Sequence, residues 1–86
     1  MPEICRFYGI VIKMYFAEHV PPHFHAEYAE HEARIAIESS AVLSGTLPPR
    51  AMGLVAEWVV LHRQGLLALW DRAMRQETLG RLEPVS

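Results

Sequence analysis

Apolar and polar residues alternate through much of the first half of the chain, and a period of two predicts β-strands. Between residues 4 and 16 apolar side chains recur at nearly every even position, which would place them on one face of a strand. We therefore predict one long first strand over 4–16. Gly9 lies inside this stretch, and we interpret it as the position of a bulge or a bend.

A second and a third strand are predicted to form a hairpin around a two-residue turn at positions 30 and 31. On the apolar face this register pairs Tyr28 with Ala33, Ala26 with Ile35, and Phe24 with Ile37. On the polar face it pairs Glu27 with Arg34, His25 with Ala36, and His23 with Glu38. A slip of one residue would move the apolar side chains to the other face, so the pattern supports this register.

After a loop at 39–41, residues 42–47 are predicted to form a fourth strand that adds Leu43 and Leu47 to the core. From residue 50 onward apolar residues recur at intervals of three and four, which is typical of a helix: Ala51, Leu54, Val55, Trp58, Leu61 and His62, then Leu66, Leu69, Trp70 and Ala73. One helix over 50–76 would be roughly 40 Å long. A domain of this size is only about 30 Å across. We therefore place a break at Gln64 and Gly65 and predict two helices, 50–64 and 66–76.

These elements predict an α+β fold for a single domain, 1–86. Its antiparallel sheet of about four N-terminal strands would have two C-terminal helices packed on one face. Trp58 and Trp70 are interpreted as core anchors between helices and sheet. Residues 79–85 would add a short edge strand, since a proline such as Pro84 is tolerated only at an edge.

The composition changes this picture in one respect, because it indicates a partner. Hydrophobic residues make up 51% of the 86 residues and the mean hydropathy is +0.08, so some apolar surface is expected to meet a second protein or another copy of the chain. The net charge of −2 is not the basic charge usual for nucleic-acid binding. The charge is also uneven: residues 18–38 hold five Glu and one Arg, a formal −4, whereas residues 50–81 hold five Arg and three acidic residues, a formal +2.

Cysteine usage and hydropathy bear on location. Cys5 is the sole cysteine, so the sequence has neither a disulfide framework nor a cysteine-based zinc motif. The longest apolar run near the N-terminus is interrupted by Lys13 and is too short to span a bilayer, and it lacks the features of a signal peptide. We expect a soluble, cytoplasmic protein with no membrane contact.

The candidate chemistry lies in the predicted second strand, where His23, His25 and Glu27 would share one face. They would form a two-histidine, one-carboxylate site for a divalent transition metal, with His19 as a weaker additional ligand. The same residues are also explained without a metal, as an outward strand face with cross-strand partners. A third interpretation is acid–base catalysis on a nucleic acid, with His23 and His25 as acid and base and Arg34 stabilising phosphate charge.

The sequence also resembles a small prokaryotic family catalogued as domain of unknown function forty-one sixty. The matching residues are Pro2-Glu3-Ile4, Arg6 to Ile10, the block Pro21-Pro22-His23-Phe24-His25, Leu47-Pro48, Glu57-Trp58, His62, Trp70 and Glu83-Pro84. Ala29 stands where the family turn often carries Gly. The resemblance implies no established activity. It implies membership of small two-gene units, which has prompted a toxin–antitoxin suggestion.

From these observations we expect a small partner-binding protein, one component of a two-gene, toxin–antitoxin-like system. The alternatives are a nucleic-acid-directed, toxin-type enzyme and a divalent-metal-binding protein that uses the His23 and His25 strand face. Whether the chain is an enzyme stays open at this point. The expected partners are a small cognate protein, a second copy of the chain, or both.

Overall fold

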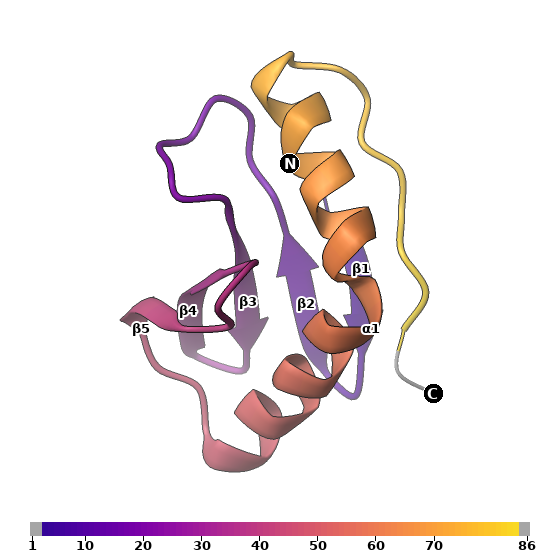
Figure 1. Cartoon of the computed structure of the whole chain (residues 1–86). Helices are drawn as coiled ribbons and strands as arrows, with labels where there is room; N and C mark the ends of the chain where they lie inside the picture. The colour runs from indigo at the N-terminus through magenta and orange to yellow at the C-terminus, as the bar shows by residue number, and fades with distance from the viewer. Residues whose placement is uncertain (1–2, 85–86) are drawn as a thin grey trace.

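The computed structural model describes residues 3–84, and five β-strands precede one α-helix in it. The elements are β1 (Glu3–Phe7), β2 (Ile10–Lys13), β3 (His23–Tyr28), β4 (His31–Ala36), β5 (Val42–Gly45) and α1 (Pro49–Met74). The strands form one antiparallel sheet in chain order, and α1 runs across one face of it (Figure 1). The predicted α+β class is confirmed. The predicted four strands and two helices are replaced by five strands and one helix.

The predicted first strand over 4–16 is in fact the hairpin of β1 and β2. The chain reverses at Tyr8 and Gly9, which have φ angles of 50° and 80°, and Phe7 pairs with Ile10. Two successive positive φ angles are what a tight two-residue hairpin turn requires, and glycine adopts them at little cost. Gly9 therefore marks a turn and not a bulge within one strand.

The hairpin of β3 and β4 forms as predicted, but its register differs by two residues. The turn lies at Ala29 and Glu30, where Ala29 has a φ of 52°. The pairs are Tyr28 with His31, Glu27 with Glu32, Ala26 with Ala33, His25 with Arg34, Phe24 with Ile35, and His23 with Ala36. Because side chains alternate with a period of two, this shift changes every partner and leaves every residue on its predicted face.

The fourth predicted strand corresponds to β5, which ends at Gly45 and not at Leu47. Leu43 is 38% exposed, so its predicted place in the core is wrong, while Leu47 packs against the core from the segment after the strand. Gly45 has a φ of 77°, and a side chain there would collide with the backbone carbonyl oxygen of Glu32. The strand therefore ends where the backbone adopts a conformation suited to glycine.

The two predicted helices are one helix, α1, with a kink at His62, whose φ and ψ are −121° and 18°. The Cα atoms of the molecule span 33 × 26 × 22 Å, and the helix fits by bending, without ending at Gly65. Leu61, placed on the apolar stripe by the sequence, is 65% exposed. Trp58 and Trp70 are buried as predicted and belong to the core between α1 and the sheet.

The segment after α1 forms no strand within residues 77–84, and Val85 of the predicted edge strand lies outside the described residues. The segment nevertheless lies against β1. Its Leu82 N–H donates to the carbonyl oxygen of Ile4 at 2.8 Å, and the indole N–H of Trp58 donates to the carbonyl oxygen of Glu83 at 2.9 Å. The C-terminal segment therefore covers the β1 edge of the sheet.

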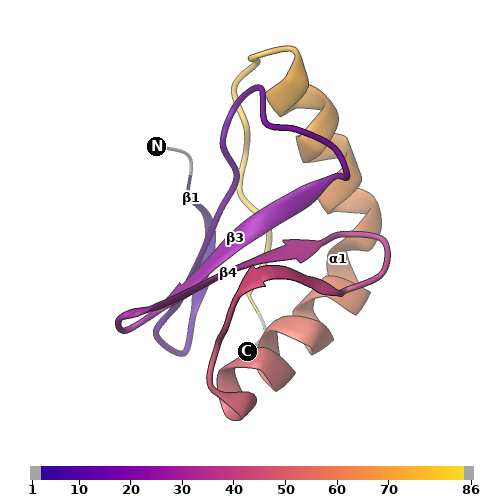
Figure 2. The ribbon, with the colours of Figure 1, turned by 90° about the vertical axis from the view of Figure 1, so that its left-hand side faces the viewer.

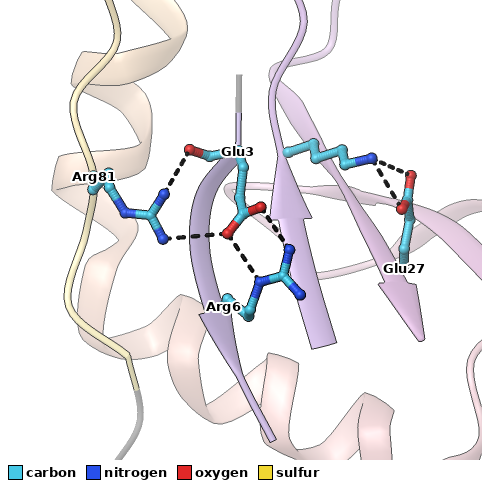
Figure 3. Close-up of polar contacts among 5 residues, drawn as sticks. Glu3, Arg6, Glu27 and Arg81 are labelled. Atoms are coloured by element: carbon cyan, nitrogen blue, oxygen red, sulfur yellow. Dashed lines mark hydrogen bonds and ion pairs between the residues drawn. The ribbon is translucent and has the colours of Figure 1, made fainter. Parts of the chain in front are cut away.

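An ion-pair cluster joins the same two parts of the chain (Figure 3). The carboxylate of Glu3 accepts from the guanidinium of Arg6 at 2.9 Å and from that of Arg81 at 3.3 Å. The hydrogen bond from Arg6 is the main cause that lowers the pKa of Glu3 from 4.5 to about 2. Within residues 3–84 no helix combines the length and the apolar character that crossing a membrane requires.

Candidate functional site

The connection between β2 and β3 shapes the candidate site, because it brings Glu18 back toward the start of β3. Ala17 has a φ of 57°, and its N–H contacts the carbonyl oxygen of Ala73, near the end of α1, at 3.4 Å. The Val20–Pro21 peptide bond is cis, and the chain then enters β3 at His23. The connection is thus held against α1, with Glu18 beside the histidines.

Glu18, His23 and His25 form one cluster around a single carboxylate oxygen. Glu18 Oε1 lies 2.8 Å from His25 Nε2 and 3.2 Å from His23 Nε2. One potential ligand atom from each residue lies within 4.8 Å of the others. His23 is 1% exposed and His25 is 8% exposed, whereas the Glu18 side chain is 27% exposed. The cluster is therefore buried on the histidine side and reaches solvent through Glu18.

The hydrogen bonds of the cluster define the tautomer of His23, and they leave one ring nitrogen of each histidine without a hydrogen-bond partner among the described residues. His23 Nδ1 lies 2.8 Å from the carbonyl oxygen of Pro21. Because a carbonyl can only accept, Nδ1 of His23 carries the proton. Among the described residues, Nε2 of His23 and Nδ1 of His25 are buried without a hydrogen-bond partner, since the 3.2 Å contact from Nε2 to Glu18 lacks the geometry of a hydrogen bond. The nearest carboxylate oxygen to His25 Nδ1 is Glu32 Oε2, at 3.5 Å.

Aromatic rings pack against both imidazoles. The ring of Trp70 lies 5.2 Å from that of His23, and the ring of Tyr15 lies edge-on, 4.6 Å from that of His25. The two imidazoles themselves are 5.5 Å apart between centroids. These contacts restrict rotation of the rings and lower the local polarity, which strengthens electrostatic interactions at the cluster.

The structure brings together only part of the set proposed from the sequence. Glu27 forms an ion pair with Lys13 at 3.1 Å (Figure 3), and His19 is exposed in the connection; neither belongs to the cluster. Arg34 is the cross-strand neighbour of His25 and donates to the hydroxyl oxygen of Ser44 at 2.9 Å. Glu18 was missed because it lies in an irregular connection, where no periodicity indicates which way a side chain points.

A second surface is the free edge of the sheet at β5. All four residues of this strand are exposed, and among them Val42 is 45% and Leu43 is 38% exposed. Within residues 3–84 no other segment pairs with β5 on its outer side, and Figure 2 views the molecule from the side on which this strand lies in Figure 1. The two edges of the sheet are thus different, since β1 is covered by the C-terminal segment.

The fold and the cluster define a class: small α+β domains in which a five-stranded antiparallel meander carries one helix and a buried histidine pair at the start of β3. The chain belongs to the family described as Domain of unknown function (DUF4160), which matches residues 9–71. The matched region contains the whole cluster and β5, but not β1 or the C-terminal segment. Comparisons with curated proteins and with solved structures found no match.

Proposed function

We propose that this chain is a partner-binding protein, one component of a two-gene, toxin–antitoxin-like system, and that its partner adds an extended segment to β5. The uncovered β5 edge carries the proposal. An edge strand presents backbone N–H and C=O groups that can pair with another chain, and such strand addition is a common mode of peptide recognition.

The side chains of β5 support this mode of binding. Val42 pairs with Ile35 and Ser44 with Arg34, so Leu43 is the extra residue of a β-bulge. Both apolar side chains are exposed at the edge and would be covered by a partner that extends beyond it. Natural proteins protect such an edge with charges, prolines, bulges or short strands. The four residues Val-Leu-Ser-Gly of β5 include a bulge but no charge and no proline. The edge is therefore available for pairing.

Charge favours a different protein over a second copy. Residues 18–38, which include β3 and β4, carry a formal charge of −4, and Glu30 and Glu32 have side chains 84% and 54% exposed. Two copies joined at β5 would bring these like charges toward each other, which disfavours association. The partner that fits is a small protein whose extended segment alternates apolar residues and is flanked by Lys or Arg.

Co-expression with the product of the neighbouring gene tests the proposal. We expect the two proteins to co-purify, and we expect Leu43→Lys to weaken binding by at least about tenfold, because it places a charge in the contact. Leu61→Lys is the matched control: it makes the same chemical change at a site that is 65% exposed on α1, and binding should be retained.

Two results would count against this assignment. Equal retention of the partner by both variants would remove β5 from the interface. A chain that self-associates without a partner, and loses this association on Leu43→Lys, would assign the edge to a second copy.

The nucleic-acid-directed enzyme gains no specific support from the geometry. His23 and His25, its proposed acid and base, are 1% and 8% exposed, and Arg34 is hydrogen-bonded to Ser44. Growth of cells that express the chain alone, compared with cells that express the His23→Ala/His25→Ala variant, tests this alternative.

A further inference from the structure

We infer that Glu18, His23 and His25 form a binding site for a divalent transition-metal ion. Nε2 of each imidazole and a carboxylate oxygen of Glu18 would be the ligand atoms. The inference is independent of the β5 edge and replaces Glu27 and His19, the ligands expected from the strand pattern, with Glu18.

The spacing of the ligand atoms fits a coordination sphere. An ion bound at about 2.1 Å by tetrahedrally arranged atoms holds them roughly 3.4 Å apart. The observed separations of Glu18 Oε1 from the two Nε2 atoms are 2.8 and 3.2 Å, and one potential ligand atom from each of the three residues lies within 4.8 Å of the others. To bind an ion, these two separations would lengthen by only a few tenths of an ångström, which small side-chain rotations can supply.

His23 is already in the state that a metal requires. Its Nδ1 proton is held by the carbonyl oxygen of Pro21 at 2.8 Å, so in the neutral ring the lone pair is on Nε2, which faces Glu18. A backbone carbonyl that orients a ligating histidine in this way is the usual outer-sphere arrangement at metal sites. The residue is 1% exposed, and its Nε2 has no hydrogen-bond partner among the described residues.

His25 reaches the same state by moving one proton. In the hydrogen bond to Glu18 its Nε2 carries the proton, because an ionised carboxylate only accepts. When Nε2 binds an ion, the proton of the neutral ring resides on Nδ1, which faces Glu32 Oε2 at 3.5 Å. Glu32 then becomes the carboxylate that orients the ligating imidazole, and no proton is gained or lost by the ring.

The explanation without a metal accounts for less of the geometry. A hydrogen bond between Glu18 and His25 satisfies one nitrogen and leaves Nε2 of His23 and Nδ1 of His25 buried without hydrogen-bond partners. Buried polar atoms in native proteins almost always have partners. A bound ion would satisfy both atoms. Nε2 of His23 would bind the ion directly, and the ring proton of His25 would lie on Nδ1, which could then donate it toward Glu32.

The ligand set also defines the class of ion. Two imidazoles and one carboxylate suit Zn²⁺, Co²⁺, Ni²⁺ or Cu²⁺ better than Mg²⁺ or Ca²⁺, which prefer oxygen ligands. Three protein ligands leave at least one position of a tetrahedral ion for water or for an external group. Glu18 is 27% exposed, so water or an external group could reach the cluster from this side.

Zn²⁺ affinity of the tag-free protein, measured by competition with a chromogenic chelator, tests the site. We expect Glu18→Gln and His23→Gln to lower the affinity by about 100-fold or more, since each removes a direct ligand. Glu32→Gln should lower it by about tenfold, as is usual when an outer-sphere partner is removed. The matched controls are Glu27→Gln and His19→Gln, which change the same residue types outside the cluster and should keep the wild-type affinity.

Two measurements on the wild-type protein keep the test decisive if a variant fails to fold. Cu²⁺ should quench the fluorescence of Trp70, because its ring lies 5.2 Å from that of His23. Nitrogen NMR of the imidazoles should show Nδ1 of His25 become protonated when Zn²⁺ is added. Wild-type affinity no tighter than that of Glu18→Gln, loss of binding in Glu27→Gln or His19→Gln, or unchanged imidazole signals with Zn²⁺ would each overturn the inference.

Discussion

Replacement of Trp58 by Ala is the most demanding test of the fold, because this side chain joins α1, the sheet and the C-terminal segment. Trp58 is 0% exposed, and its ring lies 5.6 Å from that of Phe7 and 5.7 Å from that of Phe24. Its indole N–H also donates to the carbonyl oxygen of Glu83. Removal of the ring therefore leaves a cavity at the junction of three parts of the molecule.

The expected loss in free energy of unfolding is about 3 to 5 kcal/mol for Trp58→Ala. An 86-residue domain has a total stability of about 4 to 13 kcal/mol, so the variant should be close to unfolding at room temperature. Trp58→Phe keeps a ring and loses the hydrogen bond to the carbonyl oxygen of Glu83, an exposed residue. We expect that variant to lose only about 1 to 2 kcal/mol.

Urea unfolding followed by far-ultraviolet circular dichroism measures both losses. Leu61→Ala is the control, since this side chain is 65% exposed on the same helix and its removal should change the stability by no more than about 0.5 kcal/mol. A Trp58→Ala protein whose stability lies within about 1 kcal/mol of the wild type would refute the packing of α1 described above.

Two further predictions concern the backbone and the pH dependence. Gly45→Ala should destabilise the protein by about 1 to 3 kcal/mol, because the φ of 77° and the carbonyl oxygen of Glu32 both oppose a side chain. The control is Gly53→Ala, at an open position on α1, which should stabilise the protein slightly. Equal effects of the two substitutions in urea unfolding would contradict this reasoning. Glu3, whose pKa is lowered from 4.5 to about 2, should contribute stability that is fully present above pH 4.5 and is lost as the pH falls through about 2. Glu3→Gln should therefore flatten the acid decline of the unfolding free energy over that range, and an unchanged decline would contradict the ion-pair cluster.

Sequence periodicity predicted which face the residues of β2, β3 and β4 occupy, but not where the strands turn. It was wrong for β1, where Phe7, at an odd position, pairs with Ile10 and is 5% exposed, and for Leu43. The β3–β4 hairpin differs from its predicted register by two residues because the turn is at Ala29, which adopts a left-handed conformation without being a glycine. A signal was present, since the resembling family often has Gly at this position. The turn at Tyr8 and Gly9 was missed for a related reason: the apolar residues on either side of it continue one alternating pattern.

The candidate site was predicted in part. His23 and His25 were found because the period of two places them on one strand face. Glu18 was not, because its position depends on the left-handed conformation of Ala17 and on the contact of the connection with α1, and neither follows from local sequence. Domain size and Gly65 led to a predicted break between two helices, whereas the helix continues through Gly65 and is kinked three residues earlier, at His62.

The cover over β1 has a consequence for synthesis of the protein on the ribosome. Residues 81–83, which contact Glu3, Ile4 and Trp58, are translated after every strand and after the whole of α1. Until residues 81–83 leave the ribosome, the outer edge of β1 is uncovered. A nascent or prematurely terminated chain therefore exposes unpaired backbone groups at both edge strands, β1 and β5. Such chains are prone to aggregate by edge-to-edge pairing. Chains that end shortly before residue 81 lose few core side chains, so only a small loss of stability would be expected from packing alone. Because β1 is uncovered in them, we expect a larger insoluble fraction than that loss of stability predicts.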